Sequence, residues 1–177
     1  MADSNYYFVE NVPLYGQREM GLDSVSAEMA CWFACAKMVL DAKKPQAVKI
    51  PQKLLTGGQY DLLDLRKILS DMGLTLLNGD PSVPWTAKRL ADTLEEWGPL
   101  CAYGKFFKGD METGCFGTQH CIVIIGVAAD SLVYFHDPWQ PRKDHMGIGW
   151  FQRKLCTMNL DSVSGAWVNK KTWKTIE

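Results

Sequence analysis

The chain has 177 residues, of which 47% are hydrophobic and 22% charged, and 19 Lys and Arg nearly balance 20 Asp and Glu. This length predicts one domain, residues 1–177, with a hydrophobic core of its own, and the composition excludes a disordered chain. The net charge of -1 excludes a strong electrostatic attraction to nucleic acid or to an anionic membrane surface. No apolar run reaches the roughly 18 residues of a membrane span. The first ten residues contain two acidic side chains and no basic one, which excludes a Sec-type signal peptide.

Six cysteines are unusual for a chain of this size, and they are Cys31, Cys35, Cys101, Cys115, Cys121 and Cys156. An even number could form three disulfides, but most of these cysteines lie in apolar segments, where a free thiol packs as a small hydrophobe. We therefore expect a reduced protein with mostly inert core thiols and no cofactor. A zinc site is the alternative, because Cys31 and Cys35 would share one helix face, although no second Cys/His pair has the spacing of a zinc finger.

The first part of the chain has the apolar spacing of helices. The clearest helix is expected over residues 27–42, with Asp23, Ser24 or Ser26 as its N-cap. Further helices are expected over residues 62–72 and 86–97, and Gly98 and Pro99 end the latter.

From residue 100 onward the apolar pattern has a period of two, which is typical of strands. Strands are expected over residues 100–106, 121–128 and 132–135, with further candidates at 75–77, 151–155 and 164–168. Residues 129–131 would form a hairpin turn. Helices followed by an antiparallel sheet predict an α+β fold, with a helical half at about residues 20–98 and a sheet half at about residues 99–177.

Three residues form a candidate catalytic constellation: Cys31, His120 and Asp137. Cys31 is expected about one turn inside the long helix, where the helix dipole stabilises a thiolate. His120 begins the most apolar strand and Asp137 ends the strand that returns from the hairpin turn, so the two are expected to be cross-strand neighbours. There, a carboxylate could orient an imidazole as the base for a cysteine nucleophile. Each residue alone fits a core thiol, a strand-end histidine or a turn residue better, and only the combination favours catalysis.

The other two histidines are not expected to serve as the base. His136 adjoins Asp137, and neighbouring residues on a strand point to opposite faces, so both cannot reach one cleft. His145 is expected to be a solvated residue in a loop.

Five short segments resemble those of a known family: VPLYGQ at residues 12–17, CWFACAKMV at 31–39, GPL at 98–100, HCIVIIGV at 120–127 and DPW at 137–139. In this order they are similar to bacterial papain-like cysteine peptidases, of the kind found in plant-pathogen avirulence effectors and related secreted toxins. The resemblance implies a papain-like fold, in which a long nucleophile-bearing helix packs on an antiparallel sheet and a cleft separates the two halves. It also implies that Cys31, His120 and Asp137 are the catalytic triad.

The resemblance further implies that Gln17 is the oxyanion-hole side chain, donating beside the backbone N–H of Cys31. The family usually has this glutamine about six residues before the nucleophile, whereas 14 positions separate Gln17 from Cys31. Residues 18–30 therefore contain an insertion, which would form a lid, a latch over the cleft or a loop ordered by a partner. Gln119 is a less favoured substitute for Gln17. His120 is followed by Cys121, where the family usually has a small or apolar residue.

The function expected from these residues is cleavage of peptide bonds through a thioester intermediate, as a bacterial cysteine protease effector or toxin. The same triad also serves peptidoglycan amidases and protein deamidases or transglutaminases, and a non-catalytic interaction domain on the same fold is a third hypothesis. The resemblance implies synthesis in the bacterial cytoplasm and delivery into a target cell by a specialised secretion system. The expected partners are a protein or peptide substrate and an immunity, inhibitor or host activating protein.

Overall fold

The computed structural model describes residues 6–45, 47–55, 62–77, 83–104, 106, 120–156 and 165–170. The strands in this part of the chain are β1 (Tyr7–Phe8), β2 (Leu74–Leu76), β3 (Leu100–Gly104), β4 (His120–Val127), β5 (Leu132–Asp137), β6 (Arg142–Gly147) and β7 (Gly165–Asn169). The helices are α1 (Ser24–Glu28), α2 (Cys31–Asp41), α3 (Gln52–Leu55), α4 (Leu62–Asp71), α5 (Ala87–Trp97) and α6 (Ile148–Cys156), with a 3-10 helix η1 (Gln17–Glu19).

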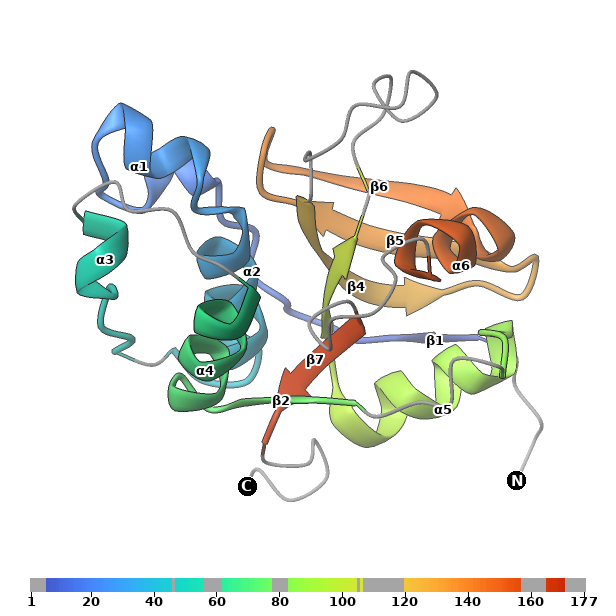
Figure 1. The fold of residues 1–177 in the computed structure, drawn as a ribbon. Coiled ribbons are helices and arrows are strands. Elements are labelled where there is room, and N and C mark those ends of the chain that lie inside the picture. Colours follow the sequence, from blue (N-terminus) through green and yellow to red (C-terminus); the bar gives the residue numbers. More distant parts are fainter. Residues whose placement is uncertain are drawn as a thin grey trace.

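The described strands form one antiparallel sheet in the order β2-β7-β3-β4-β5-β6 (Figure 1). On one side of β4, β3 pairs with the first part of the strand and β1 with its last two residues. The opposite side of β4 pairs with β5 across the expected hairpin turn. Mixed helices and strands with an antiparallel sheet agree with the expected α+β class. The two expected halves are interleaved, because β2 from the first half pairs with β7 from the second.

Two sequence-based expectations about single elements are wrong. Residues 151–155 belong to helix α6 rather than to a strand, because the buried Phe151 and Leu155 are four residues apart and the positions between them are more exposed. The helix expected over residues 27–42 is two helices, α1 and α2, with a break at Met29 and Ala30. That break fixes the position of Cys31.

Strand β4 is the centre of the fold, and all eight of its residues are buried. Its β-branched side chains suit a strand that is covered on both faces. One core cluster joins α2, α3 and α4 to the face of the sheet that carries Cys121 and Val123. A second cluster joins α5 and α6 to the face that carries Ile122 and Ile124. The sheet therefore lies between two layers of helices (Figure 1).

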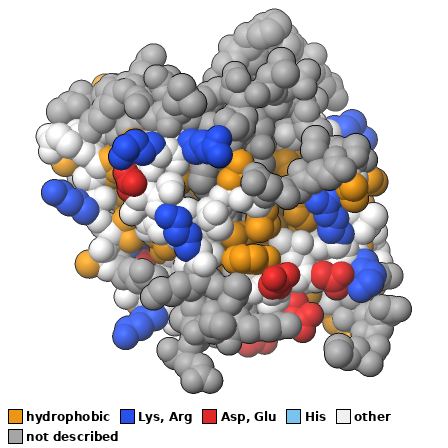
Figure 2. All heavy atoms as spheres, turned by 60° about the horizontal axis from the view of Figure 1, so that its bottom comes forward, with side chains coloured by type: hydrophobic (Ala, Val, Ile, Leu, Met, Phe, Trp, Pro, Cys, Tyr) orange, Lys and Arg blue, Asp and Glu red, His pale blue; other side chains and the backbone are white. Residues whose placement is uncertain are grey.

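The surface carries charges of both signs. The face seen in Figure 2 has Lys and Arg as well as Asp and Glu side chains, with hydrophobic side chains between them. Exposed ion pairs such as Lys67–Asp71 on α4 and Lys88–Asp92 on α5 join residues one helical turn apart. No helix in the described ranges is long and apolar enough to cross a membrane.

Candidate active site

Cys31 is the first residue of α2, and Ala30 is the N-cap, with φ -97° and no side-chain cap. The expectation that Cys31 lies one turn inside a longer helix is therefore wrong. The first four N–H groups of a helix have no partner within that helix, and the backbone N–H of Cys31 is one of them. The thiol thus lies at the positive end of the helix dipole, where a thiolate is stabilised.

The break between α1 and α2 has identifiable causes. Asp23 caps α1, where its carboxylate accepts from the backbone N–H groups of Val25 and Ser26. At the other end, the side-chain amide of Gln17 donates to the carbonyl oxygens of Ala27 at 2.8 Å and Glu28 at 3.2 Å. In a continuous helix the Ala27 carbonyl would accept from the N–H of Cys31. Gln17 therefore binds the carbonyl that would otherwise extend α1 into α2.

His120 and Asp137 are in direct contact, as the hairpin geometry suggested. His120 Nε2 lies 2.7 Å from Asp137 Oδ1, and the same oxygen accepts from the backbone N–H of Trp139 at 2.9 Å. Val123 pairs with His136, so one further step along each strand places Asp137 on the same face of the sheet as His120. The histidine side chain is 1% exposed and the aspartate side chain 13%. The bond to Asp137 leaves Nδ1 of the imidazole for Cys31.

The site favours a charged pair of thiolate and imidazolium. The pKa of the Cys31 thiol is well below its ordinary value, because its interactions with the Cys121 side chain, the His120 ring and the backbone N–H of Cys121 together outweigh burial. Burial alone would lower the pKa of His120, but its interactions with Asp137 and Cys31 raise that pKa to about 9. Both shifts favour anionic Cys31 beside cationic His120.

Gln17 is fully buried next to the insertion, and both of its donated bonds go to α1. Its Oε1 atom is buried and has no hydrogen-bond partner among the described residues. The backbone N–H of Gln17 donates to the carbonyl of Pro138 at 2.9 Å, which ties η1 to the turn that follows Asp137. In the structure Gln17 therefore lies beside the candidate site while its amide group is bound to the insertion.

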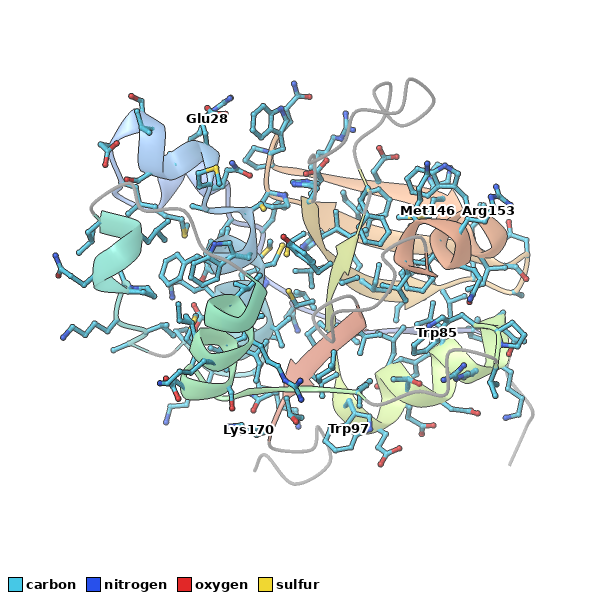
Figure 3. All side chains as sticks on the ribbon, viewed as in Figure 1. Glu28, Trp85, Trp97, Met146, Arg153 and Lys170 are labelled. Atoms are coloured by element: carbon cyan, nitrogen blue, oxygen red, sulfur yellow. The ribbon has the colours of Figure 1, made fainter. Side chains whose placement is uncertain are left out.

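The insertion at residues 18–30 lies against the turn that follows β5. It consists of η1 and α1, and Arg18 forms an ion pair with Glu28 at 2.8 Å. The guanidinium of Arg18 also lies 4.6 Å from the centre of the Trp139 ring. Figure 3 places Glu28 on the side of α1 that faces the sheet. The insertion therefore contacts the turn that follows Asp137, and its role as a lid, a latch over the cleft or a loop ordered by a partner stays a prediction.

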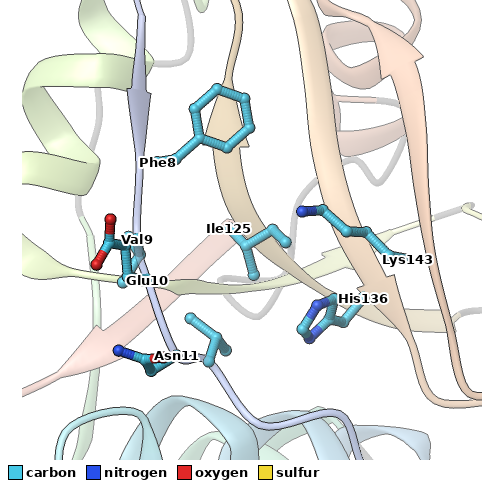
Figure 4. A pocket seen from close by; sticks show the side chains of 8 residues that line it. Phe8, Val9, Glu10, Asn11, Ile125, His136 and Lys143 are labelled. Carbon is cyan, nitrogen blue, oxygen red and sulfur yellow. The ribbon is translucent and has the colours of Figure 1, made fainter.

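His136 points away from the pair formed by His120 and Asp137. Its Nδ1 lies 3.2 Å from the carbonyl oxygen of Pro13, and its ring lines a pocket of about 470 Å³ between β1 and the β5–β6 edge (Figure 4). Burial lowers the pKa of His136, which favours a neutral imidazole. His145 is exposed as expected but belongs to β6 rather than to a loop. Gln119 lies outside the described residues.

The sequence argument did not use Cys121, whose thiol and backbone N–H both face Cys31. The available signal was its position directly after the candidate base. Cys31, Cys35, Cys101 and Cys121 are all buried free thiols, whereas Cys115 and the side chain of Cys156 lie outside the described part. Among the described residues, no three or more His, Cys, Asp or Glu side chains are arranged to hold a metal ion.

A cysteine at a helix N-terminus, beside a histidine–aspartate pair on an antiparallel sheet, is the arrangement of a papain-like cysteine peptidase. The family model described as papain-like cysteine protease AvrRpt2 matches residues 11–156. The match covers most of the chain, and the chain belongs to this family of cysteine peptidases. The resemblance seen in the five sequence segments is thus confirmed.

Proposed function

We propose that the chain is a cysteine protease effector that cleaves peptide bonds with Cys31 as nucleophile, His120 as general acid and base, and Asp137 as the group that orients His120. The observation that carries this proposal is the 2.7 Å contact between His120 Nε2 and Asp137 Oδ1, with the Cys31 thiol beside the same imidazole. A carboxylate in this position fixes the imidazole ring and stabilises its protonated form. The candidate nucleophile, base and orienting group, together with the family match, support peptidase chemistry.

In the proposed reaction, the Cys31 thiolate attacks the carbonyl carbon of the scissile peptide bond. The imidazolium of His120 gives its proton to the amine nitrogen as the C–N bond breaks, which leaves a thioester on Cys31. The neutral imidazole then takes a proton from water, the resulting hydroxide attacks the thioester, and the thiolate departs. Each turnover consumes one water and restores the starting charge pair.

The developing oxyanion needs hydrogen-bond donors near Cys31. The backbone N–H of Cys31 has no partner within α2 and supplies one donor. Gln17 is the proposed second donor, as its position at the start of η1 and next to α1 allows. To serve in this way, its amide must exchange a bond to Ala27 or Glu28 for one to the substrate.

The family suggests a biological setting. We propose that residues 1–177 form one peptidase domain, with a helical half at about residues 20–98 and a sheet half at about 99–177, delivered from a bacterial cell into a target cell where it cleaves a protein substrate. The family description, papain-like cysteine protease AvrRpt2, supports this setting. An immunity or inhibitor protein, or a host activating factor, is the proposed regulatory partner.

The reactivity of Cys31 tests the proposal without knowledge of the substrate. The native protein is treated with iodoacetamide at pH 6, and each modified thiol is located by peptide mass spectrometry. Cys31 should react far faster than the other thiols, because a stabilised thiolate is populated well below the ordinary thiol pKa of about 8.5. A mixed peptide library should be cleaved by the wild-type protein and not by the Cys31→Ala variant.

Two outcomes would contradict the proposal. One is a rate of alkylation for Cys31 at pH 6 that equals that of a free thiol. The other is cleavage of the library by Cys31→Ala at the wild-type rate. Cys35→Ala is the matched control, because Cys35 lies one turn further along α2 in the core and should be dispensable for cleavage.

A further inference from the structure

The pocket between β1 and the β5–β6 edge lies toward the end of β4 that is opposite to His120. It has a volume of about 470 Å³, and its lining includes Ile125 of β4, His136 of β5 and Lys143 of β6 (Figure 4). His136 and Lys143 are paired across β5 and β6, so their side chains emerge side by side on one face of the sheet. The pocket therefore combines an imidazole and an ammonium group with apolar side chains.

Phe8 forms an apolar wall of this pocket, and neighbouring residues fix the place of its ring. A Cβ atom on Gly126 would overlap the Phe8 ring, so the glycine in β4 leaves the space in which the ring lies. Gly126 pairs with Phe8 on one side and with Tyr134 on the other, and the two rings meet edge to face with centroids 5.1 Å apart. Phe8 nevertheless remains 40% exposed. A glycine inside a buried strand costs stability, so a fixed but exposed ring indicates a surface for a ligand.

Lys143 brings a positive charge to the same pocket. Figure 4 shows its side chain reaching from β6 toward Phe8 and Ile125, and its ammonium lies 6.0 Å from the centre of the Tyr134 ring. Within the described part of the chain, no carboxylate forms an ion pair with it. Glu10 also lines the pocket, but in Figure 4 its carboxylate points to the far side of β1. An ammonium group without a carboxylate partner beside an apolar wall suits an anionic ligand.

His136 offers a hydrogen-bond acceptor next to this ammonium group. The residue is 7% exposed, and its Nδ1 lies 3.2 Å from the carbonyl oxygen of Pro13. Burial lowers the pKa of His136 and the charge of Lys143 lowers it further, which favours a neutral ring. A neutral imidazole that donates from Nδ1 to a carbonyl has a lone pair on Nε2. Among the described residues, none forms a hydrogen bond with Nε2, so this lone pair is available to a ligand that donates.

We propose that this pocket binds a small aromatic carboxylate that also carries a hydroxyl group. Lys143 donates to the carboxylate, Nε2 of His136 accepts from the hydroxyl, and the aromatic ring of the ligand packs on Phe8. Because His136 and Lys143 are direct cross-strand neighbours, the two polar groups belong on one side of the ligand ring, as in 3-hydroxybenzoate. The site is independent of the proposed peptidase reaction, since none of its lining residues belongs to the triad.

The test is the binding of 3-hydroxybenzoate to the full chain, followed by two-dimensional NMR as the ligand is added. The resonances of Phe8, His136 and Lys143 should shift and saturate together. Benzoate lacks the hydroxyl group and should bind about fivefold more weakly, because one neutral hydrogen bond is lost. 3-Hydroxybenzylamine, which replaces the carboxylate by a cation, should not bind. A hollow that is merely left where the chain crosses the sheet predicts no such dependence on charge.

Two variants test the protein side of the same contacts. Lys143→Gln removes the charge from an exposed position and should weaken binding of 3-hydroxybenzoate about tenfold. Phe8→Leu keeps an apolar side chain but removes the ring, and it should also weaken binding. Lys88→Gln is the matched control, because it removes an exposed lysine from α5, and it should bind as the wild type does. Thermal unfolding checks that each variant is folded.

The inference is overturned if the wild type shows no saturable binding, if 3-hydroxybenzylamine binds as tightly as 3-hydroxybenzoate, or if Lys143→Gln keeps the wild-type affinity. Cys31→Ala should bind 3-hydroxybenzoate normally, and a loss of binding in this variant would place the ligand at the candidate active site instead. The outcome is separable from that of the proposed function. Alkylation of Cys31 and cleavage of the peptide library decide the peptidase reaction, and neither depends on whether this pocket binds a carboxylate.

Discussion

Asp137 raises the pKa of His120, so we expect it to determine the pH above which His120 loses its charge. Its Oδ1 atom holds the imidazole and is itself held by the backbone N–H of Trp139, so the carboxylate has little freedom to turn away. Arg142 lies 3.9 Å from the other oxygen and only 3.3 Å from Asp144, so its stronger ion pair is with Asp144. The contact with His120 is therefore the main interaction through which Asp137 acts.

A pH profile of kcat/KM checks this role. Activity should fall as the pH rises through about 9, because the proton that His120 gives to the leaving amine is lost there. Asp137→Asn keeps the shape of the side chain but removes the charge that favours imidazolium, so this alkaline limb should move to lower pH. At an alkaline pH above the new limb, kcat/KM of the variant should be about tenfold lower than that of the wild type for each unit by which the pKa of His120 decreases.

Asp92→Asn is the control for this profile, because it removes a negative charge from an exposed ion pair with Lys88 on α5. It should leave the alkaline limb at the wild-type position. An unchanged limb in Asp137→Asn, or an equal shift in both variants, would show that Asp137 does not set the charge of His120.

At the residue scale, the contact between His120 and Asp137 could be anticipated from the sequence because a short hairpin turn fixes which strand ends meet. The surroundings of Cys31 could not be anticipated in the same way. Cys121 reaches Cys31 only because α2 packs on this particular face of β4, and that packing depends on residues far apart in the chain. The apolar spacing of one helix or strand does not show which other helix or strand packs on it.

At the scale of elements, the break between α1 and α2 decides what Cys31 can do. The sequence from residue 27 to residue 42 has an uninterrupted helical pattern, so nothing local indicated the break. Its cause is the side chain of Gln17, which lies outside the pattern and binds two carbonyls at the end of α1. A hydrogen bond between distant residues thus overrides local helix propensity.

Gln17→Ala distinguishes two roles of this glutamine. If Gln17 donates to the oxyanion, as proposed, the substitution should lower kcat by about 10²–10³ more than it lowers the alkylation rate of Cys31, because alkylation forms no oxyanion. Both rates are measured at the same pH on the same preparation. A parallel loss in both would show that Gln17 acts only by setting the position of Cys31 at the start of α2.

At the scale of the whole molecule, the two helical layers protect most of the thiols. Cys35 and Cys101 are fully buried beneath α2 and the sheet, whereas Cys31 lies at the margin of the same core. The composition and apolar periodicity indicated a well-packed α+β protein. They did not indicate that β2 and β7 would pair across the chain, since strand order in a sheet depends on long-range contacts.

Thiol alkylation in sub-denaturing guanidinium chloride should reveal this difference. Modification of Cys35 and Cys101 requires the core to open, so their rates should rise with denaturant as steeply as global unfolding does. Tryptophan fluorescence gives the reference unfolding curve. The rate at Cys31 should change little below the transition. A rate at Cys101 that does not depend on denaturant would contradict the burial described for the core.

The buried strand β4 has one more consequence, for the unfolded chain. After His120 it continues with seven residues that carry no charge and no proline, five of them valine or isoleucine. Such a segment readily stacks with copies of itself once it is exposed, and the two helical layers are what prevents this in the folded protein. The strand that carries the candidate base is therefore also the segment from which we expect aggregation to begin on heating.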